Sequence, residues 1–216
     1  MLKNNIKDEL QNILSGKSQV GDGNVIQTIA NYLRRSQTTS KLAQTDKYYK
    51  KEETEKLLIF IKQNDIWVKS VNFDSFLSEG AEQRVFIKDD KTVYKLNDSI
   101  YYTTWLDYFN NLLLNNYFFP DTAYSLKGFY LSDDNILYAF IEQPYVKATH
   151  TTNLEQVREF MRGNGFENVR NNDYYNPELG IILEDLHDEN VLTQNGTLYF
   201  IDTVFYINSE IFWAKG

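Results

Sequence analysis

Asp185-Leu186-His187-Asp188-Glu189-Asn190-Val191-Leu192 is followed along the chain by Asn195-Gly196 and by Leu198-Tyr199-Phe200-Ile201-Asp202. Asp185 and Asn190 stand five positions apart, and a short apolar strand, a turn dipeptide and a second apolar strand then lead from Asn190 to Asp202. Because Asn-Gly readily takes the positive φ angles of a type I′ turn, this pattern predicts a hairpin that brings Asp202 back beside Asn190.

These residue types are the ones that phosphoryl transfer requires. The carboxylate of Asp185 would receive the proton of the attacking hydroxyl, while the amide of Asn190 and the carboxylate of Asp202 would hold metal ions that neutralise a triphosphate. For D-x-x-x-x-N alone, an ordinary acidic loop is the better interpretation. With the strand, the turn and the strand-end aspartate all in order, the sequence predicts a kinase that uses ATP and Mg²⁺.

Composition limits the class of protein. The 216 residues are 42% hydrophobic and 15% aromatic, enough for one core, two small lobes and an extension. Cysteine is absent, so there is no disulfide framework or thiolate metal site, which suits the cytoplasm. The formal net charge of −8 argues against generic binding to nucleic acid. We see no signal peptide and no run near the roughly 20 apolar residues of a membrane span, so we expect a cytoplasmic protein without membrane contact.

Residues 1–66 predict a helical N-terminal extension. Residues 36–50 contain almost no aliphatic side chain and predict an exposed connection. Because no chemistry is visible here, we expect helical packing against the body of the protein, and a surface for a partner is the alternative. Apolar residues recur at helical spacing in three segments: Ile6 to Leu14, Val25 to Leu33 after the turn Gly21-Asp22-Gly23, and Glu52 to Asn64.

Residues 67–146 predict a small lobe and its connector. The expected elements are strands at 84–88 and 92–96, a helix from Trp105 to before Pro120, and strands at 123–131 and 136–141. That order is typical of the small lobe of a protein-kinase-like fold. In the connector Glu142 to Val146 the backbone would pair with the adenine edge, and Tyr145 and Val146 would line the base pocket. A surface turn set by Pro144 is the alternative interpretation.

The loop from Ser78 to Val85, at the start of the first of these strands, stands where a glycine-rich loop would cover phosphates. Only Gly80 keeps the glycine pattern, and Ser78 and Gln83 occupy the other two glycine positions if Val85 closes the motif. A simple hairpin turn is the alternative.

Lys95 lies inside the next strand, and we expect its cation to face the α and β phosphates rather than solvent. The usual partner of this lysine is a glutamate on the following helix. Here Asp107 is the only acid between Tyr101 and Asn116. Glu79 or Glu82 from the preceding loop could substitute for it.

Residues 147–216 predict a short second lobe. A helix is expected at 152–163, with Asn153 as its cap and an inward face of Leu154, Val157, Phe160 and Met161. A loop-rich segment, 163–180, follows it, and residues 181–183 lead into Asp185.

Four segments together resemble the kinase domain of polyvalent proteins, a family carried by phages, plasmids and conjugative elements. They are Ser-Glu-Gly-Ala-Glu-Gln (78–83), Val-Tyr-Lys-Leu-Asn-Asp (93–98), Asn-Tyr-Phe-Phe-Pro (116–120) and Gly-Ile-Ile-Leu-Glu-Asp-Leu-His-Asp-Glu-Asn-Val-Leu (180–192). The resemblance covers residues 67 to about 207. More distantly, the catalytic loop is similar to that of aminoglycoside phosphotransferases. The resemblance implies an α+β, minimal two-lobed protein-kinase-like fold and ATP-dependent phosphotransfer, with Asp185 as base, Asn190 and Asp202 as metal ligands and Lys95 on the phosphates.

The chain also departs from the kinase pattern. Asp202-Thr203-Val204 replaces Asp-Phe-Gly, and the 14 residues after Asp202 leave no room for an activation segment or for the later helices that dock peptides. A partner or fused domain could complete the substrate site, the acceptor could be a small molecule rather than a protein, or the N-terminal helices could complete the lobe. The alternative function is a pseudokinase or docking module that keeps the fold for protein interaction.

Overall fold

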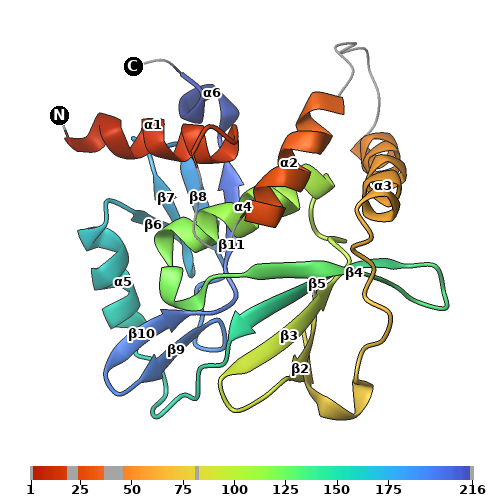
Figure 1. Ribbon diagram of the computed structural model, residues 1–216. Coiled ribbons are helices and arrows are strands. Elements are labelled where there is room, and N and C mark those ends of the chain that lie inside the picture. The colour runs from red at the N-terminus through yellow and green to blue at the C-terminus, as the bar shows by residue number, and fades with distance from the viewer. Residues whose placement is uncertain (1, 19–23, 37–45, 81–82, 215–216) are drawn as a thin grey trace.

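The structure is a computed structural model that describes residues 2–18, 24–36, 46–80 and 83–214. The turn expected at residues 21–23, the middle of the expected connection and Glu82 lie outside the described residues. A five-stranded antiparallel sheet carries the middle of the chain, in the strand order β1-β2-β3-β5-β4 (Figure 1). Its strands are β1 (Phe76–Glu79), β2 (Gln83–Ile87), β3 (Thr92–Asn97), β4 (Ser125–Leu131) and β5 (Leu137–Pro144).

The two faces of this sheet have different roles, because side chains alternate along a strand. On β3, Tyr94 and Leu96 point to one face, where Phe86, Tyr138 and Phe140 form a small aromatic cluster with Leu96. Val93 and Lys95 point to the other face and are both buried. The lysine therefore faces into the protein, as we expected.

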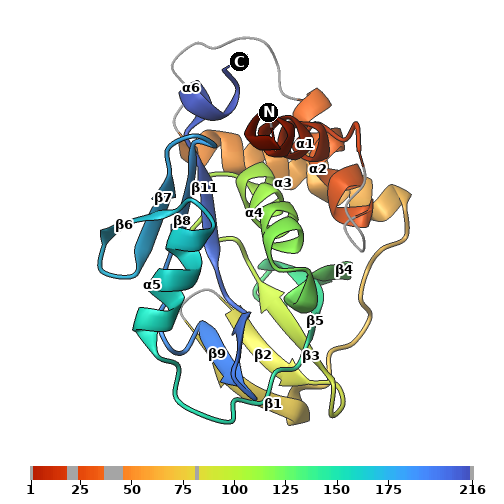
Figure 2. The same ribbon diagram turned by 90° about the vertical axis from the view of Figure 1, so that its left-hand side faces the viewer.

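Four helices form a layer beside the sheet (Figure 2). Helix α4 begins after Thr104, whose side chain caps the helix by accepting from the Asp107 amide. Phe119 separates the end of the helix from the 3-10 turn η3 (Pro120–Thr122). Its Trp105 and Phe109 pack against Phe129 of the sheet. The helices of the layer are α1 (Leu2–Leu14), α2 (Asn24–Ser36), α3 (Asp46–Gln63) and α4 (Trp105–Phe118).

Helix α3 begins earlier than the sequence indicated. Residues 46–50 were expected in an exposed connection, but they form the first turn of α3. Polar contacts rather than aliphatic burial hold this end: Lys50 Nζ donates to the carbonyl oxygens of Tyr102, at 3.0 Å, and of Ser99. A hydrophobic pattern cannot detect such contacts.

The second lobe contains a four-stranded sheet, in the order β11-β8-β7-β6, and a separate two-stranded hairpin. The segment 163–180, expected to be loop-rich, contains β6 and β7. All four residues of β6 are exposed and only Val169 is apolar, so β6 lacks the apolar alternation of a buried strand. Phe160, expected on the inward face of α5, is 43% exposed and rests on Phe200. The elements are α5 (Leu154–Gly163), β6 (Glu167–Arg170), β7 (Asp173–Asn176), β8 (Ile181–Glu184), β9 (Val191–Gln194), β10 (Thr197–Phe200), β11 (Val204–Ile207) and α6 (Ser209–Phe212).

The larger hydrophobic core, separate from the small aromatic cluster, includes residues from Leu10 on α1 to Phe212 on α6. The first and last helices touch, since Lys7 Nζ donates to the Ile211 carbonyl at 2.6 Å and Gln11 Nε2 donates to the Phe212 carbonyl (Figure 1). The N-terminal helices therefore pack on the body of the protein, as expected. The domain boundaries at residues 66 and 146 remain predictions. None of the helices in the described part of the chain is both long and apolar enough to cross a bilayer.

Candidate active site

A cleft of about 430 Å³ separates the five-stranded sheet from the β9–β10 hairpin. It collects nearly all of the residues that the sequence predicted for a nucleotide site. The predicted residues that line it are Ser78, Gly80, Gln83, Val85, Lys95, Tyr145, Val146, Asn190 and Asp202. Glu142 is the exception, and Asp185 lies beside the cleft rather than in its wall.

The hairpin forms as the sequence indicated and joins the two predicted metal ligands. Asn195 and Gly196 have φ angles of 50° and 82°, the two positive values that a type I′ turn needs. The strands pair Val191 with Phe200, and one residue further the Ile201 amide donates to the Asn190 carbonyl at 2.9 Å. Asn190 and the residue before Asp202 are therefore held together by the backbone.

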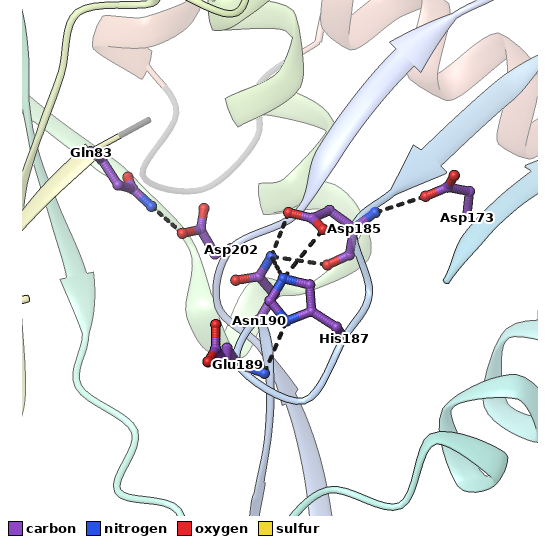
Figure 3. A network of polar contacts seen from close by, with 7 residues as sticks. All are labelled: Gln83, Asp173, Asp185, His187, Glu189, Asn190 and Asp202. Carbon is purple, nitrogen blue, oxygen red and sulfur yellow. Dashed lines mark hydrogen bonds and ion pairs between the residues drawn. The ribbon is translucent and has the colours of Figure 1, made fainter. Parts of the chain in front are cut away.

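Asp185 is fixed in an unusual backbone conformation by side chains around it (Figure 3). Its φ of 67° lies in the left-handed region, which costs energy for a residue with a side chain. Its amide donates to Asp173 Oδ1 at 3.2 Å. Asn190 Nδ2 donates to the Asp185 carbonyl and to Asp185 Oδ2, both at 2.9 Å. Because both partners are acceptors, the Asn190 nitrogen is assigned to that side and its carbonyl oxygen is turned away from Asp185.

His187 supports the same carboxylate. Its Nδ1 accepts from the Glu189 amide at 3.2 Å, so the proton of a neutral ring is assigned to Nε2. Nε2 lies 3.2 Å from Asp185 Oδ1, and the His187 amide donates to the Asp185 carbonyl at 2.9 Å (Figure 3). Both carboxylate oxygens of Asp185 therefore face a donor. Asp188 is exposed, whereas Glu189 lines the cleft.

Lys95 reaches the other side of the cleft. Its side chain starts on β3, and Nζ donates to the Ile201 carbonyl at 2.9 Å, with the Tyr124 ring 5.4 Å away. The acids proposed as its partner have other contacts. Asp107 accepts from the Thr104 hydroxyl at 2.7 Å at the start of α4, and Glu79 pairs with Arg84 at 2.7 Å.

The glycine-poor loop sends a side chain across the cleft. Gln83, in a position where the kinase pattern has glycine, is 9% exposed and donates from Nε2 to Asp202 Oδ2 (Figure 3). Ser78 pairs with Val85 across β1 and β2, and the Gly80 amide donates to the Gln83 carbonyl at 2.9 Å. The loop and the predicted metal ligand are thus in direct contact.

Glu142 does not line the cleft, because it is paired within the sheet, with Tyr94 of β3 and Ser125 of β4. It is part of β5, and its side chain pairs with Lys88 at 2.6 Å and with Lys127 at 3.4 Å. Burial raises the pKa of Glu142, but the hydrogen bonds and charges of the two lysines outweigh it and lower the pKa overall. The strand alternation that sends Glu142 outward sends Gln143 into the cleft, where it is 1% exposed. The strand continues to Pro144, so the connector begins later than expected.

Several cleft residues were not predicted from the sequence. Val93 could have been found, because it lies two residues before Lys95 on the same strand face, and Leu192 likewise follows Asn190 by two. Ile201 had no local signal. Gln143 and Pro144 fall inside the connector expected at Glu142 to Val146, and Glu79 was considered as a partner of Lys95. The cleft residues for which the sequence analysis predicted no role are Leu77, Val93, Glu189, Leu192 and Ile201.

The surroundings of Asp185 are acidic. Burial raises the pKa of Glu184, and the charges of Asp173 and Asp185 raise it further. In the described residues, no group of three His, Cys, Asp or Glu side chains could hold a metal ion by itself. A cation at Asn190 and Asp202 would therefore need further oxygen ligands from water or from a phosphate group.

Comparison with known proteins identifies the relationship. A family model described as "Serine/Threonine/Tyrosine Kinase found in polyvalent proteins" matches residues 50–209. The matched region extends from α3 through the five-stranded sheet, the catalytic loop and β11. No curated protein and no solved structure was found to match the chain. Because the family model spans well over half of the sequence, the chain belongs to the family of serine/threonine/tyrosine kinases found in polyvalent proteins.

Proposed function

We propose that this chain is a minimal kinase that binds ATP in the cleft and transfers its γ-phosphoryl group to a hydroxyl acceptor. One observation carries the proposal: Lys95, Asn190 and Asp202 line one cleft, and Asn190 is bonded to Asp185 at the edge of it. A cation, two metal-type ligands and a base in this arrangement match what phosphoryl transfer needs.

The nucleotide would enter with its base between the two lobes. Val85 and Val93 from the sheet and Leu192 from the hairpin give the cleft apolar walls of the kind that hold a flat base. Tyr145 and Val146 lie where the connector passes the cleft, and they would line the base pocket. The Tyr145 amide donates to the Lys91 carbonyl at 2.7 Å, so other backbone groups of the connector would pair with the adenine edge. The triphosphate would then extend toward Lys95, beneath the loop of Ser78, Gly80 and Gln83.

The residues fit a magnesium ion. Asp202 offers a carboxylate and Asn190 an amide oxygen that its hydrogen bonds to Asp185 leave turned the other way. Oxygen ligands of this kind, one or two from the protein and others from phosphates and water, are what Mg²⁺ prefers. When bound, Mg²⁺ would neutralise charge on the β and γ phosphates.

Asp185 would act as the general base. The acceptor oxygen forms a bond to the γ phosphorus, the bond from that phosphorus to the bridging oxygen of ADP breaks, and the hydroxyl proton passes to the Asp185 carboxylate. His187 and Asn190, each within 3.2 Å of a carboxylate oxygen, would hold that group in place.

The acceptor is either a protein side chain or a small molecule. The acids around Asp185 favour an acceptor that carries positive charge, such as a basic protein segment or an amino sugar. We expect residues 1–216 alone to phosphorylate unrelated peptides poorly, because β11 pairs with β8 and α6 contacts α1, so these elements are already engaged within the fold. A partner or fused domain would then complete the acceptor site.

A pseudokinase is the second candidate function. The contact of Gln83 with Asp202 favours it, because a side chain here occupies space that glycine leaves open for phosphates. Transfer of labelled γ-phosphate, to the chain itself or to acceptors in a peptide and amino-sugar screen, discriminates between the two. Transfer that depends on Asp185 excludes the pseudokinase.

Nucleotide binding is the first test. Titration with ATP and Mg²⁺ to 100 times Kd should stabilise the fold by about 2.7 kcal/mol, which raises the unfolding midpoint of a chain of this length by about 5–10 °C. The absence of any shift at millimolar ATP, with and without Mg²⁺, would contradict the proposal.

A further inference from the structure

Three hydrogen-bond donors converge on one carbonyl oxygen next to the predicted metal ligand. The Ile201 carbonyl accepts from Lys95 Nζ at 2.9 Å, from Tyr124 Oη at 3.0 Å and from Gln143 Nε2 at 3.0 Å. Ile201 directly precedes Asp202. A carbonyl oxygen has two lone pairs, so two donors are enough to satisfy it and the third is in excess.

Tyr124 is held in place independently of the cleft. Asn116, buried on α4, accepts from the Tyr124 amide at 2.7 Å and donates to the Tyr124 carbonyl at 2.8 Å. The Tyr124 side chain is itself only 3% exposed. Its hydroxyl is therefore fixed on Ile201 by a buried clamp from the helix.

Gln143 is fixed in a similar way. It lies within β5, is 1% exposed, and its amide nitrogen also donates to the Thr122 carbonyl at 2.8 Å. Lys95 differs from both, because a lysine has a flexible four-carbon chain and its ammonium group can change partners. Of the three donors, Lys95 is the one whose charge a triphosphate would attract.

We propose that Tyr124 and Gln143 are positioning residues that keep the Ile201 carbonyl bonded when Lys95 turns to the phosphates of the nucleotide. The inference rests on the proposed function and deepens it. With both neutral donors present, Lys95 leaves an oxygen that stays satisfied. Without them, its departure would leave a partly buried carbonyl without a partner, and Lys95 would be retained on Ile201 instead.

The expected effect is specific to phosphates. Adenosine has no phosphate and makes no demand on Lys95, so its affinity should not depend on these donors. For ATP, we expect Tyr124→Phe or Gln143→Met alone to weaken binding by about two- to threefold, because one neutral donor remains, and the double variant by about tenfold.

The experiment compares Kd values for ATP and adenosine by calorimetry, with and without Mg²⁺, in the full 216-residue chain. Tyr117→Phe is the matched control, since it also removes one tyrosine hydroxyl, which is bonded to Glu9 of α1 at 3.1 Å and does not line the cleft. Tyr124→Phe, Gln143→Met and the double variant are repeated in a Lys95→Met background. Unfolding midpoints report on any general loss of stability.

The inference is supported if the ratio of adenosine Kd to ATP Kd falls in the Tyr124 and Gln143 variants and stays constant in Tyr117→Phe. In the Lys95→Met background, the Tyr124 and Gln143 substitutions should leave this ratio unchanged. If ATP and adenosine weaken equally, or if the effect persists in Lys95→Met, the two residues serve only packing and the inference is wrong while the proposed function stands. If the unaltered chain binds neither ligand, the proposed function and the inference both fail.

Discussion

The two walls of the cleft are built from contacts of different range. At the hairpin wall, Asn190 is bonded to Asp185 beside the cleft, and His187 contacts the same carboxylate, all within five residues of sequence. In the sheet wall, Lys95 and Gln83 reach partners that are 106 and 119 residues away. The hairpin side keeps the three polar residues of the kinase pattern, Asp185, Asn190 and Asp202, whereas the sheet wall replaces two glycines and has no glutamate on α4.

This difference shows which parts of the site tolerate change. The β9–β10 hairpin brings Asn190 and Asp202 together through its own backbone, and Asn190 then bonds to Asp185, so most of this geometry is set by local contacts. The position of Lys95 depends on how the lobes pack, and different side chains can secure it. Here Ile201, Tyr124 and Gln143 take part in that packing.

Replacing the base should give the largest effect. We expect Asp185→Ala to lower phosphotransfer by roughly 10²- to 10⁴-fold, because the acceptor hydroxyl loses its general base. ATP affinity should change little, since Asp185 does not line the cleft and Asn190 keeps its bond to the Asp185 carbonyl. The measurement is turnover of labelled ATP beside calorimetric binding, with exposed Asp188→Ala as the control. A parallel loss of ATP binding would show that the role is misassigned.

Replacing Asp202, a carboxylate in the wall of the cleft, should weaken ATP binding rather than act on turnover. Asp202→Asn keeps an acceptor for Gln83 but removes an anionic ligand, so Mg²⁺-dependent ATP affinity should fall about tenfold or more. Adenosine affinity should stay unchanged, because the apolar walls are intact. Calorimetry with both ligands makes the comparison. If Mg²⁺ improved ATP binding as much in the variant as in the original chain, Asp202 would not be a metal ligand.

The same contrast explains what the sequence could predict. Asp185, Asn190 and Asp202 are joined by a turn that a dipeptide specifies, so their meeting could be expected from local geometry. The contacts of Ile201 with Tyr124 and Gln143 join residues 77 and 58 positions apart, and no periodic pattern encodes them. Glu142 was misplaced because the end of β5, and with it the face of each side chain, depends on pairing with β3. The roles of all these residues in catalysis remain predictions.

A smaller effect should come from the sheet wall at Gln83. Its amide donates to Asp202 Oδ2, so a metal ion that needs this oxygen must compete with the amide. We expect Gln83→Ala to lower the Mg²⁺ concentration for half-maximal ATP binding by about two- to fivefold. Arg84→Ala is the control, since the neighbouring side chain leaves the cleft to pair with Glu79. A higher Mg²⁺ requirement would mean that Gln83 positions Asp202 rather than competing for it.

The smallest expected effects are on the unfolding midpoint, and they have opposite signs for two glutamates, one on each side of the cleft. The pKa of Glu142 is lowered, so Glu142 contributes stability at neutral pH that is lost as the pH falls through its folded pKa. The pKa of Glu184 is raised, first by burial and then by Asp173 and Asp185, so Glu184 favours the fold only while protonated and opposes it as the pH rises through its folded pKa. Both side chains are partly solvated, which keeps the effects small.

At pH 7, Glu184→Gln should therefore raise the unfolding midpoint by about 1–2 °C, and Glu142→Gln should lower it by a similar amount. At a pH below the lowered folded pKa of Glu142 both differences should vanish, because each native glutamate is then protonated. Thermal unfolding at the two pH values checks the signs, and a Glu184→Gln variant that is less stable at pH 7 would contradict the raised pKa.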